Sequence, residues 1–194
     1  MIYHTNNNGE TSEKQLKQNQ QIMKHMKEII LKPIGRVHVK FDDETVKKSM
    51  FGVKGEIEVF KEYEEGLEGI DGFSHLIIIA YLHKVTEEQK KLLNVRFRRL
   101  QRFGLKEEEL PEVGVFCCDS PHRPVPIALT IVRLVKREGR RLYVENLDLF
   151  DGTPVLDIKP YTPERIIEDL ELPEWYKELY KKVAKITGIE KPYL

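Results

Sequence analysis

The carboxylates between Leu147 and Tyr161 are the residues of this chain that folding alone explains least well. Asp148, Asp151 and Asp157 recur among Leu, Phe, Val and Ile, and a Gly-Thr-Pro turn separates the second from the third. A carboxylate beside buried apolar surface needs a partner or a function, because desolvating an unpaired charge is costly. This segment is therefore the first candidate for a functional site.

A second polar stretch lies in residues 114–129, where prolines at 121, 124 and 126 predict an extended, stiff loop after a strand. Such a loop fixes polar groups in advance of binding, and His122 and Arg123 are its natural anion-facing groups. A structural crossover with solvated charges explains the same residues equally well.

His75 and His83 flank a continuous apolar run, 76–82. Eight residues is an even step along a strand, so both rings could face the same side. Each is more often a satisfied core or rim histidine than a catalyst. No third His, Cys or carboxylate stands at metal-ligand spacing, so no metal site is expected.

The densest basic patch is Arg96, Arg98 and Arg99, with Phe97 among them. Arginines with an aromatic neighbour could hold RNA phosphates and stack on a base. A solvated surface is the commoner explanation of such a run.

Composition excludes several classes of protein. Lys+Arg and Asp+Glu are both 32 in 194 residues, which argues against a chain that coats nucleic acid by charge alone. No apolar run is long enough for a membrane span, and the first residues lack signal-peptide features. The adjacent Cys117 and Cys118 indicate a reduced, cytoplasmic protein. A Gly-x-Gly-x-x-Gly turn and a P-loop are both absent, so a Rossmann-type nucleotide site is not supported.

The spacing of apolar residues predicts a mainly β fold. Six or more short strands without regular helical alternation favour a closed β-barrel. Six of them are expected at residues 34–39, 55–60, 76–82, 114–118, 129–135 and 141–147. A hairpin turn is expected at Glu138–Arg141.

Two helices are also predicted. The first is a short one from Thr86, its cap, to Leu93. The second begins at Pro173, ends at Gly188 and packs against the barrel. It presents one apolar and aromatic face, formed by Trp175, Tyr176, Leu179, Tyr180, Val183 and Ile186. The expected organisation is a polar tail (1–28), a barrel domain (29–163) and a C-terminal helical extension (164–194).

Several motifs, in order, resemble one known family. Pro-Ile-Gly-Arg-Val at 33–37, Gly-Phe-Ser-His at 72–75, the proline-rich loop and, above all, Asp-Gly-Thr-Pro-Val-Leu-Asp-Ile-Lys-Pro-Tyr at 151–161 are similar to the TsaA/TrmO-like family. The resemblance implies a seven-stranded β-barrel and a homodimer whose interface helps to build the cofactor site. It also implies S-adenosylmethionine-dependent methylation of N6 of threonylcarbamoyladenosine beside the tRNA anticodon.

The resemblance and the chemistry of the residues together predict roles for individual side chains. Those expected to hold the cofactor are His83, Lys84, Asp119, Leu129, Glu145, Asn146, Leu147 and Asp148. The candidate bases are Asp148, Asp151 and His83, which the sequence does not rank. Those expected to contact the RNA are Arg123, His122, Lys159, Tyr161, Arg96, Arg98 and Arg99.

The chain departs from the family pattern at three places. Residues 40–49 lack the family's Pro-Arg-Gln triplet, Asp119 stands where the family has Arg, and Val125 and Ala128 replace Asn and Gly. Two alternatives therefore stay open: a non-catalytic barrel that binds a small molecule or RNA, and a methyltransferase for a different acceptor.

Overall fold

The structure is a computed structural model that describes residues 29–190. The expected polar tail, residues 1–28, lies outside the described part. The chain divides between Lys32 and Pro33 into two units, and every element below belongs to the second.

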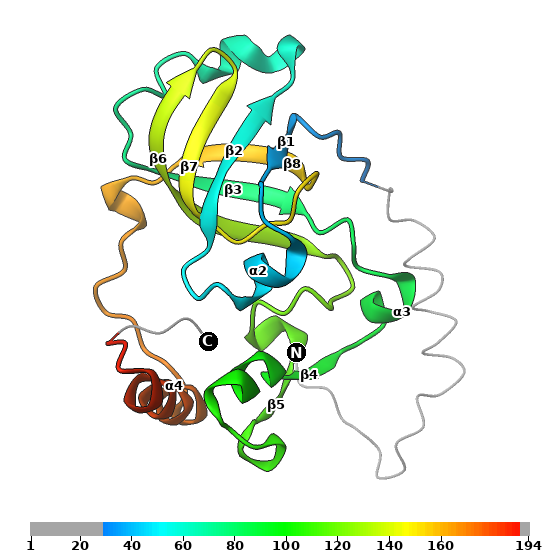
Figure 1. The fold of residues 1–194 in the computed structure, drawn as a ribbon, viewed down its shortest axis with the longest axis vertical. Coiled ribbons are helices and arrows are strands. Elements are labelled where there is room, and N and C mark those ends of the chain that lie inside the picture. The colour runs from blue at the N-terminus through cyan, green and yellow to red at the C-terminus, as the bar shows by residue number, and fades with distance from the viewer. Residues whose placement is uncertain (1–28, 191–194) are drawn as a thin grey trace, which may run out of the picture. The chain divides into compact units, whose positions relative to one another are not determined.

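Six antiparallel strands close into a barrel, in the order β1-β2-β7-β6-β3-β8 (Figure 1). Their bounds are β1 Gly35–His38, β2 Val53–Val59, β3 His75–Tyr81, β6 Ile127–Glu138, β7 Arg141–Leu147 and β8 Pro154–Pro160. The strand β8 closes the barrel by pairing with both β1 and β3, with Gly35 opposite Val155 and Ile78 opposite Ile158. The Asp-Gly-Thr-Pro motif is therefore the corner that leads into the closing strand.

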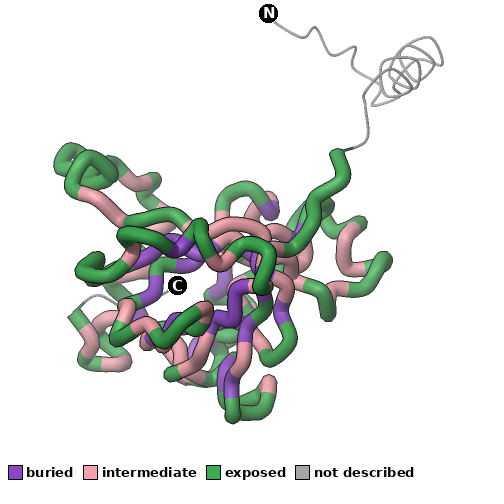
Figure 2. Tube along the Cα trace, turned by 90° about the horizontal axis from the view of Figure 1, so that it is seen from above, coloured by how far each residue is buried: buried purple, intermediate pink, exposed green. Residues whose placement is uncertain are grey.

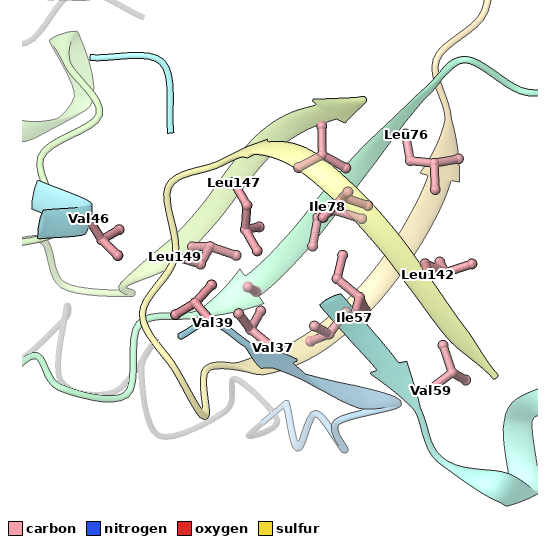
Figure 3. Close-up of a cluster of buried hydrophobic side chains, with 14 of the residues drawn as sticks. Val37, Val39, Val46, Ile57, Val59, Leu76, Ile78, Leu142, Leu147 and Leu149 are labelled. Carbon is pink, nitrogen blue, oxygen red and sulfur yellow. The ribbon is translucent and has the colours of Figure 1, made fainter. Parts of the chain in front are cut away.

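The barrel interior is filled by aliphatic side chains from alternate strand positions. Val37, Ile57, Ile78 and Leu142 are fully buried and point toward one another across it (Figure 3). Burying one such side chain contributes about 1.5–3 kcal/mol. Figure 2 shows buried positions alternating along the chain with intermediate and exposed ones, with long exposed stretches in the outlying segments.

A small lobe is inserted between β3 and β6. It contains α3 Glu87–Lys90, the two-stranded sheet of β4 Asn94–Arg96 and β5 Glu112–Gly114, and the 3₁₀ helices η2 Arg98–Phe103, η3 Glu107–Glu109 and η4 Val115–Cys117. The C-terminal helix α4 Glu174–Thr187 joins this lobe. Its own apolar cluster consists of Leu100, Leu105, Leu110, Leu179 and Val183.

Three predictions about the barrel and this lobe were wrong. The barrel has six strands in the described part of the chain, where seven were expected. Residues 114–118 form no barrel strand, because the β5 segment pairs with β4 and Val115 then turns into η4, donating its N–H to Leu93 O at 3.0 Å. The helix α4 packs on η2 and not on the barrel, since its buried residues Leu179 and Val183 belong to the lobe's cluster.

Other local predictions are confirmed. Thr86 and Gln89 form a capping box on α3, although that helix stops at Lys90. Gly139 lies in the β6–β7 hairpin with φ +56°, and Gly188 ends α4 with φ +70°. The remaining helices are α2 Asp43–Lys48, η1 Lys61–Leu67 and η5 Pro163–Arg165. Within residues 29–190, no helix is long and apolar enough to span a membrane.

Candidate functional site

The helix α2 marks one end of the barrel, in a segment for which the sequence predicted no helix. Its first N–H groups are capped by Asp42, whose Oδ1 accepts from Thr45 N at 2.7 Å. Acidic residues occupy its first turn and Lys47 and Lys48 its last, as the helix dipole favours. This capping pattern is a sequence signal that could have revealed the helix.

Lys84 ties α2 to the end of β3. Its Nζ donates to both carboxylate oxygens of Asp43, at 2.8 and 2.7 Å, and lies 5.1 Å from the centre of the Phe150 ring. The Lys47 Nζ lies 5.7 Å from the same ring. Thus α2, the end of β3 and the loop after β7 meet at one place. Asp43 and Phe150 are members of this group that the sequence interpretation missed.

His83 lies beside Lys84 in this group. Burial lowers the pKa of His83 from its usual value of 6.5, the charge of Lys84 lowers it further, and Asp43 and Asp151 oppose both effects. The neutral imidazole is therefore the main form at pH 7, so its ring can accept a proton or a hydrogen bond.

Asp151 has a structural partner at the barrel corner. Its Oδ1 accepts from Val39 N at 3.0 Å, while Gly152 N donates to Val37 O at 2.9 Å. The turn is thereby fixed to the chain just after β1. Asp148 is exposed and has no hydrogen bond or ion pair within residues 29–190. Of the two carboxylates, Asp148 is the one that remains available to a ligand.

The end of β7 adopts an unusual backbone conformation. Asn146 has φ +64°, the only positive φ at a non-glycine residue in the described range, and its Nδ2 donates to Phe51 O at 3.0 Å. Backbone outliers of this kind cluster at ligand sites. Leu147 is fully buried in the core, whereas Glu145 turns outward and pairs with Lys54 and Arg133 at 3.1 and 3.6 Å.

These residues form the candidate site, which we call the α2-end cluster: Asp43, His83, Lys84, Asn146, Leu147, Asp148, Phe150 and Asp151. It combines an exposed carboxylate, a neutral histidine, an aromatic ring and an oriented ammonium group. No group of three or more potential metal ligands occurs among residues 29–190.

Leu129 lies on the outer face of the barrel. It is opposite Ile79 of β3, and 65% of it is exposed. It points away from the core, together with Ile131 and Val135 on the same strand.

The proline-rich loop uses Arg123 internally. Its guanidinium donates to Ser120 O at 2.9 Å, to Val115 O at 2.7 Å and also to Cys118 O. Arg123, which was predicted to bind an anion, thus donates its hydrogen bonds to carbonyls of its own loop. His122 is tied to the same loop through its N–H, which donates to Ser120 Oγ at 3.3 Å.

The basic patch lies in the lobe and is largely paired. Arg96 contacts Glu112 at 2.8 Å, and Arg98 contacts Glu107 at 3.2 Å. Asp119 and Arg99 both act electrostatically on Tyr176 of α4. Asp119 is therefore near α4.

Lys159 and Tyr161 are at the other end of β3 from His83. Lys159 is opposite Ile77 and pairs with Asp157 at 2.6 Å, and Tyr161 N donates to His75 O at 3.1 Å. The strand β3 runs for seven residues from His75 to Tyr81, and His83 follows its end, so the two histidines lie at opposite barrel ends. Lys159 and Tyr161 therefore do not join the α2-end cluster.

Comparison with known proteins places this barrel in a family. The model of the tRNA-methyltransferase O N-terminal domain matches residues 44–165. A probable S-adenosyl-L-methionine-binding protein of Pyrococcus abyssi is 36% identical over 161 residues, which cover 81% of each chain. The human tRNA (adenine(37)-N6)-methyltransferase is 39% identical over 117 residues, covering 58% of this chain and 24% of that protein.

A solved structure supports the same assignment. The crystal structure of TrmO from Pseudomonas aeruginosa superposes with a TM-score of 0.55 at 27% identity, covering 75% of this chain and 62% of that one. The present chain thus spans less than two thirds of that structure and about a quarter of the human enzyme. From the matched domain and these relatives, the chain belongs to the tRNA-methyltransferase O family.

Proposed function

We propose that this protein is an S-adenosylmethionine-dependent methyltransferase that methylates N6 of threonylcarbamoyladenosine in the tRNA anticodon loop. The observation that carries the proposal is the α2-end cluster, which lies almost wholly within the matched family domain. The Pyrococcus and human relatives, named for the cofactor and for tRNA adenine methylation, support it.

The residues present suit this cofactor. S-adenosylmethionine supplies an electrophilic methyl group on a cationic sulfonium. Asp148 offers an unpaired carboxylate, and the Phe150 ring already attracts two ammonium groups, so this end of the barrel favours a cation. Asn146 keeps its amide oxygen available because its Nδ2 is bonded to Phe51 O. Lys84, oriented by both oxygens of Asp43, can donate to a carboxylate.

Methyl transfer to an amine nitrogen is an in-line displacement, in which positioning supplies much of the rate. The acceptor nitrogen must also lose its proton. Neutral His83 and unpaired Asp148 are the two groups placed to accept it, while Asp151 is held by Val39 N. A base removes the N6 proton of the carbamoylated amine more easily than that of adenosine itself, because the carbamoyl group acidifies the N–H.

The enzyme is further proposed to be a cytoplasmic homodimer. The outer face of β6 supports this assembly, since Leu129, Ile131 and Val135 are 65, 39 and 56% exposed along one strand. Leu129 and Ile131 are neighbours on this face, and Arg133 separates them from Val135. Exposed apolar side chains gathered on one face are typical of an interface, and Leu129 would bring the partner to the cofactor site. The substitution Ile131→Glu with Val135→Glu should give a monomer in light scattering, whereas Val125→Glu should leave the mass unchanged. A monomeric parent protein would refute the assembly.

The direct test is methyl transfer from radiolabelled S-adenosylmethionine to two tRNAs that differ only in the threonylcarbamoyl group. We expect labelling of the modified tRNA, and reduced labelling in Asp148→Ala. Asp169→Ala removes an exposed carboxylate outside the cluster and is the matched control. Labelling of neither tRNA by a protein that binds the cofactor would favour a different acceptor.

A further inference from the structure

A row of aromatic rings runs across the lobe from η2 to α4. Phe97 and Trp175 have ring centres 6.0 Å apart, and Trp175 meets Tyr176 edge-on at 5.4 Å. Tyr176 and Tyr180 then stack, with 6.4 Å between centres and 22° between planes. This row belongs to neither the barrel core nor the α2-end cluster, and α4 lies beyond the matched family domain.

The two tyrosines lie at the margin of the helix's packed face. Leu179 and Val183 fill the lobe's cluster and are 4% and 0% exposed. Tyr176 and Tyr180 are one helical turn apart and only half-buried. The Tyr180 hydroxyl contacts Glu190 O at 3.4 Å, so its ring is held near the helix end. Two stacked and partly exposed rings are thus presented at the margin of the helix.

The charges around these rings favour an anionic partner. The helix α4 carries four lysines and two glutamates, a net charge of +2 in a chain whose formal net charge is zero. Lys181 and Lys185 form no ion pair within the described range. Burial raises the pKa of Tyr176, as does the charge of Asp119, whereas Arg99 lowers it. The phenol therefore lies within reach of the proline-rich loop and of one arginine of the basic patch.

We propose that Tyr176 and Tyr180 bind unpaired RNA bases by stacking, with the α4 lysines at the backbone phosphates, so that α4 holds nucleotides of the acceptor RNA. This inference rests on the proposed RNA methyltransferase function. Aromatic faces bind successive bases of any sequence, and nearby cations attract the backbone. The stacked pair explains how a chain with no overall positive charge and a largely paired arginine patch can retain a loop of RNA.

The test measures binding of the full chain to a fluorescein-labelled anticodon stem-loop that carries threonylcarbamoyladenosine. Stacking on one ring contributes about 5- to 150-fold in affinity, so replacing both rings in Tyr176→Leu with Tyr180→Leu should weaken binding about 30-fold or more. Tyr176→Phe with Tyr180→Phe keeps the ring faces and should bind like the parent. Tyr63→Leu, at an exposed tyrosine of η1, is the matched control and should also bind like the parent.

A second measurement covers the case in which the leucine variant does not fold. Photocrosslinking of the parent protein to the same RNA with 4-thiouridine in the loop should label the peptide that contains α4. Leucine variants that bind within twofold of the parent, or crosslinks only to other peptides, would overturn the proposal. If the parent still methylates tRNA in either case, the stacking role fails while the proposed function stands. A parent that neither binds nor methylates RNA would overturn both.

Discussion

Gly52 offers the sharpest test of how the α2-end cluster is built. It has φ +73°, and a Cβ added there would lie 2.5 Å from Asn146 C and 2.6 Å from Leu147 N. Both atoms are backbone, so neither can move away without shifting the end of β7. Ser49 Oγ, which donates to Gly52 O at 2.6 Å, fixes the turn from the other side.

The cost of Gly52→Ala has two parts. A left-handed conformation at alanine costs about 1–2 kcal/mol. Forcing an extra methyl group into a closely packed position costs about 1–3 kcal/mol more. Gly69→Ala isolates the first part, because Gly69 has φ +76° and nothing within 4 Å of its added Cβ. We therefore expect Gly52→Ala to lose about 2–5 kcal/mol and Gly69→Ala about 1–2 kcal/mol.

Urea denaturation followed by circular dichroism measures both free energies of unfolding. Titration calorimetry with S-adenosylmethionine should then show weaker binding for Gly52→Ala, because Asn146 and Leu147 are displaced, and unchanged binding for Gly69→Ala. Equal destabilisation by the two substitutions would refute the steric argument. Unchanged cofactor affinity in a folded Gly52→Ala variant would show that the end of β7 does not contribute to cofactor binding.

Two further predictions concern ionisable groups. Glu58 is 6% exposed and contacts His38 Nε2 at 2.8 Å and Arg140 Nη2 at 2.7 Å; the His38 hydrogen bond and then Arg140 lower its pKa. Glu58→Gln should cost about 1–3 kcal/mol at pH 7. Because the folded-state pKa of Glu58 is lowered, this stabilisation is present above pH 4.5 and is lost as the pH falls below it. Thermal melts at pH 7 and pH 3 should therefore show that the stability difference between the parent and Glu58→Gln shrinks at low pH. A difference that stays constant would contradict the assignment. If His83 is the base, its lowered pKa puts the acid limb of the pH profile of kcat/KM below pH 6.5. The substitution His83→Gln should then remove that limb. A limb that persists in His83→Gln would show that another group is the base.

The strands were predictable because their signals are local. Alternation at 55–60 and the apolar run at 76–82 match β2 and β3, and Thr86 and Gly188 mark helix ends by their own chemistry. The closing of the barrel by β8 was not predictable in the same way. Gly35 and Val155 pair across 120 residues, and no local pattern specifies that register.

The site was only partly predictable, because residue type does not show which partner a side chain takes. Lys84 contacts the first residue of α2, and Asn146 contacts Phe51 shortly after α2 ends, so these two residues lie beside the same helix, while their roles toward the cofactor stay a prediction. Arg123, by contrast, is bonded to three carbonyls of its own loop, and only the folded loop reveals this. Asp43 was missed because its importance comes from Lys84, 41 residues away.

The proline-rich segment shows how a motif can mislead about structure. Residues 114–118 have the apolar character of a strand, yet Gly114 is the last residue of β5 and Val115 begins a 3₁₀ turn. Burial of Val115 within that turn, at 1% exposed, satisfies the same apolar pattern without a barrel strand. Phe116 of the same segment is 82% exposed, so only part of the apolar pattern is buried and the expected strand is absent.

The central claim, that the α2-end cluster holds S-adenosylmethionine, is tested most directly by titration calorimetry of the parent protein and Asp148→Ala with S-adenosylmethionine and S-adenosylhomocysteine. The account predicts binding of both ligands to the parent. It also predicts that Asp148→Ala weakens binding of the cationic cofactor more than binding of its neutral product, because the carboxylate favours the sulfonium. Absence of binding to the parent at millimolar cofactor, or equal affinity of parent and variant for the cofactor, would contradict it.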